Sequence, residues 1–160
     1  MKCRTFRSIV RGLTAALIAV LAHATAGTAQ STAANAKPSR EDSAAIRAAA
    51  LDYVEGWYTA NADRMRNAVH PDLAKRIVSG NGTNDRVENM TAEQLIRATG
   101  MNRNTIPEAQ QVKNIKILDI YGNTASVRAE MAGWFDYMQL GRVNGKWVII
   151  NVLWVLKPPA

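Results

Sequence analysis

Two side chains of this sequence are candidates for proton transfer, His70 and Asp136. Histidine can accept or release a proton near neutral pH, so His70 is a candidate general base or acid. The alternative, which we favour, is that it satisfies backbone carbonyls where a helix ends before Pro71. Asp136 could shuttle protons if it faces an apolar pocket. Its alternative role is an ion pair with an arginine, on an exposed face or at a subunit interface, and both roles stay open.

The surroundings of Asp136 are aromatic. In an extended strand, alternate residues share a face, so Trp134 and Asp136 would lie on the opposite side from Phe135 and Tyr137. Asn151 is the one polar residue in the interior of the apolar segment 146–156. We expect it to have a partner, because an unpaired buried amide costs about 1–3 kcal/mol. It could orient a ligand in a pocket or bond to its neighbours within the sheet.

The sequence supplies few other reactive side chains. Beyond the first 29 residues it contains one histidine, His70, and no cysteine, because Cys3 is the only cysteine. Thiolate catalysis, disulfides and cysteine-based metal sites are therefore excluded there. The loop Gly80-Asn81-Gly82 lacks the Lys-Ser/Thr pair of a phosphate-binding loop. We predict neither a metal site nor a cofactor.

The first 29 residues have the three-part pattern of a secretory signal peptide. Four basic residues precede an apolar run over residues 13–22, which is shorter than the roughly 20 residues that cross a bilayer. Small residues follow, and cleavage is expected after Ala26 or Ala29. We predict an exported protein, periplasmic or secreted, with a flexible tether over residues 30–41 and one domain over residues 42–157. The alternative is an uncleaved N-terminal anchor.

The charge balance argues against nucleic acid as a partner. Four of the 20 Lys and Arg residues lie in the leader, which leaves 16 against 13 Asp and Glu, a net charge of +3. These charges are interspersed, whereas a nucleic-acid-binding surface needs clustered basic residues. We interpret the tightest group as a solvated helix face and the turn after it: Arg64, Arg66, Lys75 and Arg76. We also expect no stable membrane insertion after cleavage.

Apolar spacing predicts three helices in the first half of the domain. The first starts near Ser43 and carries one apolar face made of Ile46, Ala50, Tyr53 and Trp57. Asn61 is the expected N-cap of a second, shorter helix that must end before Pro71. Residues 91–94 form a capping box for a third helix, which ends at Gly100. Tyr53 and Trp57 are expected to face a sheet, as core residues and as walls of a pocket.

The second half of the domain is typical of β structure. We predict a short strand over residues 73–79, and then a three-stranded antiparallel meander over residues 112–121, 124–143 and 146–156. Gly133, inside the long middle strand, indicates a bulge or bend. The dense apolar side chains of the last strand suggest that both of its faces are covered. Helices followed by an antiparallel meander define the α+β class.

Six segments of the domain are recognisable by their order and spacing. They are Gly56-Trp57-Tyr58, His70-Pro71-Asp72-Leu73-Ala74-Lys75-Arg76, Met90-Thr91-Ala92-Glu93-Gln94-Leu95, Tyr121-Gly122-Asn123-Thr124-Ala125, Trp134-Phe135-Asp136-Tyr137 and Asn144-Gly145-Lys146-Trp147-Val148-Ile149-Ile150-Asn151-Val152-Leu153-Trp154. In these segments the chain resembles the putative lumazine-binding family of the nuclear transport factor 2-like superfamily. The resemblance implies a cone, in which N-terminal helices wrap a strongly curved antiparallel sheet and a pocket lies at the open end. It also implies that Asn151 points into this cone.

The resemblance does not select a function, because the superfamily includes ketosteroid isomerase, scytalone dehydratase and polyketide cyclases, and also members without chemistry. The function that we expect is a binding domain for a small apolar or aromatic ligand, with Tyr53, Trp57, Trp134, Asp136 and Asn151 as ligand-binding residues. One alternative is a cofactor-free isomerase, dehydratase or cyclase that uses Asp136 and His70. Another is a homodimeric interaction domain with a vestigial pocket. Catalysis requires both proton-transfer residues in one cavity, and a binding module requires an apolar cavity without that pair.

Overall fold

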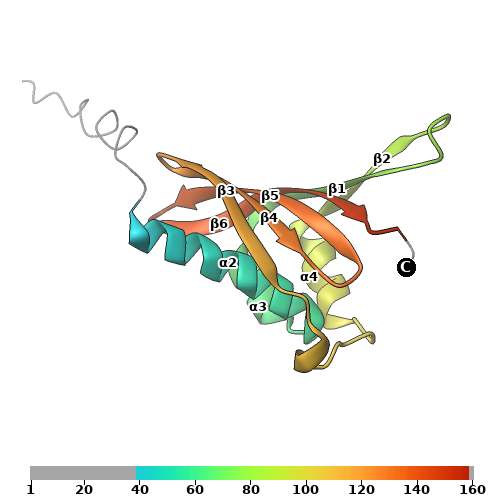
Figure 1. Cartoon of the computed structure of the whole chain (residues 1–160), viewed down its shortest axis with the longest axis horizontal. Coiled ribbons are helices and arrows are strands. Elements are labelled where there is room, and N and C mark those ends of the chain that lie inside the picture. Colours follow the sequence, from blue (N-terminus) through green and yellow to red (C-terminus); the bar gives the residue numbers. More distant parts are fainter. Residues whose placement is uncertain (1–38, 159–160) are drawn as a thin grey trace, which may run out of the picture.

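The domain is a curved six-stranded sheet with three α-helices on its interior face (Figure 1). The structure, a computed structural model, describes residues 39–158. The predicted signal peptide and most of the predicted tether lie outside these residues. The strand order is β2-β1-β6-β5-β4-β3, so the first and last strands of the chain meet at the centre of the sheet.

The three helices form where the sequence predicts them. Helix α2 spans Arg40–Tyr58, and it begins before Ser43 because the Ser39 hydroxyl accepts a hydrogen bond from the backbone N–H of Asp42 at 2.9 Å. Helix α3 spans Ala62–Ala68 and is capped by Asn61. Helix α4 spans Ala92–Gly100, and the capping box is present. A short 3-10 helix, η1, covers Glu108–Gln110.

The meander has four strands instead of three. They are β3 (Asn114–Tyr121), β4 (Thr124–Glu130), β5 (Trp134–Val143) and β6 (Lys146–Leu156). The predicted long strand reverses direction around Gly133, so that Glu130 pairs with Phe135. The break is held by a hydrogen bond from the backbone N–H of Met131 to the carbonyl of Trp134 at 2.9 Å. Gly133 therefore marks a chain reversal, where the sequence suggested a bulge or bend within one strand.

Two further strands make the sheet mixed, where an antiparallel sheet was expected. Strand β1 spans Val69–Ser79, longer than predicted, and it pairs parallel to β6. Strand β2, over Arg86–Thr91, was not predicted and pairs antiparallel with β1 after the predicted loop of residues 80–85. This strand is mostly exposed and polar, so it lacks the apolar alternation by which strands are recognised.

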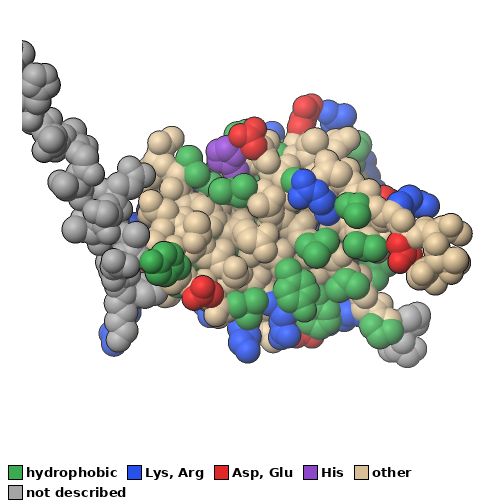
Figure 2. Space-filling model, turned by 90° about the horizontal axis from the view of Figure 1, so that it is seen from above, with side chains coloured by type: hydrophobic (Ala, Val, Ile, Leu, Met, Phe, Trp, Pro, Cys, Tyr) green, Lys and Arg blue, Asp and Glu red, His purple; other side chains and the backbone are tan. Residues whose placement is uncertain are grey.

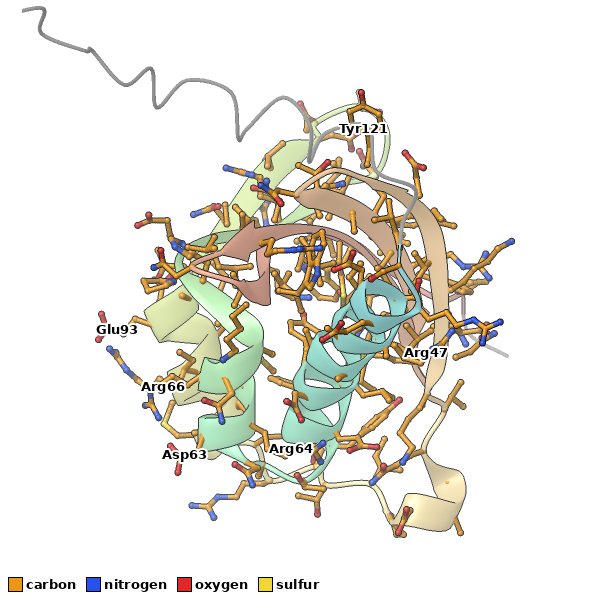
Figure 3. The ribbon with its side chains drawn as sticks, turned by 90° about the vertical axis from the view of Figure 1, so that its left-hand side faces the viewer. Arg47, Asp63, Arg64, Arg66, Glu93 and Tyr121 are labelled. Carbon is orange, nitrogen blue, oxygen red and sulfur yellow. The ribbon has the colours of Figure 1, made fainter. Side chains whose placement is uncertain are left out.

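Polar contacts fix the helices against the sheet and against each other (Figure 3). The Arg47 guanidinium of α2 donates to the carbonyl of Ile115 in β3 at 3.0 Å. Arg64 of α3 donates to the Asp52 carboxylate of α2 at 2.8 Å. At Gly56 the two helices approach so closely that an added Cβ would lie 3.0 Å from the backbone nitrogen of Met65.

The other face of the sheet is open to solvent. Figure 2 looks onto this face and shows hydrophobic side chains among charged ones. Exposed apolar side chains of β1, β2, β5 and β6, 42–63% accessible, include Val78, Val87, Tyr137, Leu153 and Val155. The prediction that both faces of the last strand are covered is therefore wrong for its outward residues. Among residues 39–158, no helix is long and apolar enough to cross a membrane.

Candidate functional site: an apolar cavity with a buried ion pair

A cavity of about 240 Å³ opens between the helices and the interior face of the sheet. Three tryptophans contribute to its wall, and its one charged wall residue is Lys75. The complete wall consists of Tyr53, Trp57, Lys75, Met90, Leu95, Met131, Trp134, Trp154 and Leu156. The surface is therefore almost entirely apolar, as expected of a site for a small molecule.

Each wall residue is placed by the periodicity of its own element. On β5, Trp134 faces inward with the fully buried Asp136, whereas Tyr137 faces solvent. On β6, Trp154 pairs with Asp136 and so shares the interior face. On α2, Tyr53 and Trp57 lie one turn apart on the side that faces the sheet.

Lys75 and Asp136 form a buried ion pair in the wall. The Lys75 Nζ lies 2.7 Å from Oδ1 of Asp136 and donates a second hydrogen bond of 2.7 Å to the hydroxyl of Tyr53. The Trp134 Nε1 donates to the other carboxylate oxygen of Asp136 at 3.2 Å. Lys75 is 8% exposed and Asp136 is 0% exposed, so solvent screens the pair very little.

Burial shifts the ionisation of this cluster. It lowers the pKa of Lys75, because removal from water disfavours the ammonium, and the Asp136 charge counteracts this effect in part. Burial also raises the pKa of Tyr53 well above its usual value, and the negative charge of Asp136 adds to the rise. Tyr53 is therefore a neutral partner of the ion pair throughout the physiological range.

Aromatic rings surround the ammonium. The Lys75 Nζ lies 4.8 Å from the ring centroid of Trp154 and 5.4 Å from that of Tyr53, within the range of cation–π attraction. Trp57 and Trp134 meet edge to face, with ring centroids 6.1 Å apart. These contacts fix the ring orientations and present aromatic surface to whatever enters the cavity.

The structure does not bring His70 to the cavity. Its Nδ1 accepts a hydrogen bond from the backbone N–H of Asp72 at 3.1 Å, and it lies 3.6 Å from the Asp72 carboxylate. His70 belongs to β1, because helix α3 ends two residues earlier, at Ala68. The His70–Asp136 pairing that the enzyme hypothesis requires is therefore not formed.

Asn151 also lies away from the cavity, which corrects the expectation drawn from the family resemblance. In the β5–β6 register, Gln139 pairs with Asn151 and Leu140 with Ile149, so Ile150 is an extra, bulged residue. After the bulge, the inward-facing residues of β6 change from odd-numbered to even-numbered positions. Asn151 therefore faces outward, in an open pocket of about 340 Å³ that it shares with the polar side chains of Asp119, Ser126 and Gln139.

Sequence reasoning missed Lys75, which it placed in a solvated cluster. One signal could have identified it. Leu73, Lys75 and Ile77 alternate along β1, and Leu73 is buried, so the same face carries the lysine inward. Lys75 also pairs with the buried Val152 of β6, a parallel pairing that the sequence does not predict.

The ligand-binding residues predicted from sequence divide into three groups. Tyr53, Trp57 and Trp134 line the cavity, Asp136 lies directly behind the wall, and Asn151 is outside. That any of them binds a ligand stays a prediction. Within residues 39–158, no group of three or more His, Cys, Asp or Glu side chains lies close enough together to hold a metal ion.

The architecture is shared with solved structures of the nuclear transport factor 2-like class. One is an NTF2-like protein of unknown function from Shewanella baltica OS155, with 21% identity and a TM-score of 0.65 over 78% of this chain and 100% of that one. A second, from Silicibacter pomeroyi DSS-3, has 15% identity and a TM-score of 0.59 over 76% and 100%. A ketosteroid isomerase-like protein from Erwinia carotovora atroseptica has 16% identity and a TM-score of 0.55 over 76% and 100%. At these identities the likeness defines the fold, an NTF2-like α+β cone.

Within that class the sequence identifies a particular family. Residues 41–155 match the family described as Putative lumazine-binding, and the chain belongs to it. A comparison with curated proteins gives no significant match. The family resemblance and the cone expected from the sequence are thus both confirmed, apart from the parallel pairing at the centre of the sheet.

Proposed function

We propose that this domain binds a small planar molecule in the cavity, with an acceptor atom of the ligand facing Lys75. The observation that carries the proposal is that Lys75 is the one charged residue in the wall of an otherwise apolar cavity. An ammonium has three donors, and two of them are used by Asp136 and Tyr53 among residues 39–158. The third can orient a carbonyl or ring-nitrogen acceptor.

The size and lining of the cavity limit the ligand. At about 240 Å³ it is somewhat below the range of pockets for drug-sized molecules, so one or two fused rings would fill it. The aromatic wall residues Trp57, Trp134 and Trp154 favour a flat apolar partner. Lumazine is a two-ring molecule with carbonyl oxygens, and the family name supplies it as the first compound to test.

Binding, and not proton-transfer catalysis, is what the geometry supports. His70 lies away from the cavity, so the two proton-transfer residues that the enzyme hypothesis requires do not share it. The leader pattern of residues 1–29 adds the proposal that the domain works in the periplasm or outside the cell. The absence of a cofactor stays a prediction.

The test is a titration of the purified protein with lumazine, in which tryptophan fluorescence reports binding. Three of the four tryptophans line the cavity, whereas Trp147 donates to Asp42 elsewhere, so Trp147→Phe removes the background signal. We expect saturable quenching that Trp154→Ala weakens and Asn151→Ala leaves unchanged. If lumazine and 2-naphthalenemethanol, a two-ring apolar alcohol, both fail to quench, the proposal is wrong.

The interaction-domain hypothesis has one observation in its favour, the apolar outer face of the sheet. Leu153 and Val155 of β6 and Tyr137 of β5 are 42–50% exposed on that face. Apolar surface of this kind marks interfaces when it is contiguous. A homodimer through this face stays a prediction, which light scattering tests with Leu153→Glu as the disrupting variant. The cavity of about 240 Å³ argues against the vestigial pocket of that hypothesis.

A further inference from the structure

Lys75 has the surroundings of a reactive amine. Its side chain contributes to the cavity wall, beside a ligand bound as proposed above, and the residue is 8% exposed. A lysine in an apolar pocket is a better nucleophile than an exposed one, because desolvation favours its neutral form. Burial does lower the pKa of Lys75. The other described lysines lie outside the cavity wall: Lys113, Lys116, Lys146 and Lys157.

A proton acceptor is also in place. Oδ1 of Asp136 lies 2.7 Å from the Lys75 Nζ, close enough to take a proton directly from the ammonium. Trp134 donates to the other oxygen, Oδ2, and keeps the carboxylate in this orientation. The pair can therefore exchange a proton without solvent.

We propose that Lys75 forms an imine with an aldehyde carried by a small aromatic molecule in the cavity, an inference that rests on the proposed binding function. Asp136 accepts a proton from the Lys75 ammonium, and the neutral amine attacks the carbonyl carbon. One of the two remaining amine protons then moves to the carbonyl oxygen, which gives a neutral carbinolamine. The protonated Asp136 returns its proton to the departing hydroxyl, which leaves as water. The product is a protonated imine beside the Asp136 carboxylate, so charge and atoms balance and no oxidant or reductant is needed.

The surroundings suit this product as well as the free amine. The positive charge stays on the same nitrogen, with the same counter-ion at Asp136 and the rings of Trp154 and Tyr53 at cation–π distance. The hydroxyl of Tyr53 remains neutral and adjacent, as a hydrogen-bond partner for the carbinolamine oxygen. The same cavity would thus hold an aldehyde covalently and the corresponding alcohol reversibly.

The experiment uses the purified protein, 2-naphthaldehyde and cyanoborohydride, which reduces an imine to a stable amine. We expect peptide mass spectrometry to place the adduct on Lys75 first, and excess 2-naphthalenemethanol to slow its formation. Lys75→Arg should lose this adduct, and Lys116→Arg, a matched change at an exposed site, should keep it. The comparison among lysines within the unmodified chain does not depend on whether Lys75→Arg folds.

The outcomes separate this inference from the proposed function. If the alcohol quenches tryptophan fluorescence but adducts form on Lys116 and Lys146 as readily as on Lys75, the imine proposal is overturned and binding stands. If neither lumazine nor the alcohol binds and labelling follows exposure alone, both proposals fail. Labelling of Lys75 that the alcohol does not slow would also overturn the inference, because the aldehyde would then react without occupying the cavity.

Discussion

Lys75 and Asp136 lie 61 residues apart in the chain and on strands that are not neighbours, yet their side chains meet at 2.7 Å. Strand β6 separates β1 from β5, so the ion pair crosses over it on the interior face, with Trp154 of β6 beneath the ammonium. The pair therefore couples one half of the sheet to the other. The pair therefore lies on the interior face across three adjacent strands, β1, β6 and β5.

Removing the carboxylate alone should be costly. In Asp136→Leu the Lys75 ammonium stays buried without its counter-ion, and breaking a buried pair in this way costs about 3–5 kcal/mol. Urea denaturation of the variant measures this loss. The double variant Lys75→Met/Asp136→Leu should recover most of it, because replacing both charges by apolar side chains is often neutral. Equal stability of the single and double variants would contradict this account.

Alkaline stability should depend on Tyr53. Its pKa is raised in the folded protein, so it stabilises the fold fully below about pH 10 and progressively less above that pH, where the unfolded tyrosine ionises first. Tyr53→Phe should therefore lose less stability than the unmodified protein above about pH 10. The variant starts about 1 kcal/mol less stable, because Lys75 loses its hydrogen-bond acceptor.

Lys75 acts in the opposite direction: its pKa is lowered in the folded protein, so its contribution to stability rises with pH up to about 10.4. Urea unfolding across this range measures both, with the exposed Tyr137→Phe as the control.

The contact between helices α2 and α3 should tolerate no side chain at Gly56. Alanine is the better helix former, but its Cβ would lie 3.0 Å from the Met65 nitrogen and 3.2 Å from the Asn61 carbonyl oxygen. Both are backbone atoms, so the helices must separate, and we expect Gly56→Ala to destabilise by about 1–3 kcal/mol. Gly100→Ala is the matched control, because its Cβ would meet only a Cβ at 3.4 Å. That variant should be neutral or more stable in thermal unfolding.

The two faces of β6 should differ in their effect on binding. Trp154→Ala removes an aromatic wall of the cavity and should weaken binding of lumazine by about tenfold, which corresponds to about 1.4 kcal/mol. Asn151→Ala changes the outward face and should leave the affinity unchanged. Isothermal titration calorimetry provides both values. A loss of affinity in the asparagine variant would contradict the bulge at Ile150.

The sequence predicted local structure well and long-range pairing poorly. Caps at Asn61 and Thr91 and the turn at Asn144-Gly145 act over a few residues, so their chemistry is visible in the chain. The parallel contact of β1 with β6 joins segments far apart, and no local pattern encodes it. That single pairing explains why Lys75 was assigned to the surface.

The candidate site was predicted in part for the same reason. Alternation along β5, which the sequence shows, places Asp136 on one face with Trp134, but the sequence left open whether that face is interior. Asn151 was misplaced because one bulged residue, Ile150, reverses the alternation after it, and a bulge between apolar residues leaves no mark in the sequence. The residue that Asp136 pairs with was sought among arginines, whereas it is a lysine on β1, which lies opposite Val152 of β6 while Asp136 lies opposite Trp154.

The central place of β6 also sets the order in which this chain can fold during synthesis. Strands β1 and β5 are made before residue 146, but each needs β6 as its neighbour, and the parallel pairing with β1 closes a loop of more than 70 residues. Until Lys146–Leu156 is available, the sheet has two separate halves with unpaired edges, and such chains fold slowly. A ribosome-bound chain truncated before Lys146 should therefore remain sensitive to protease, and protection should appear in a single step once the last strand has emerged.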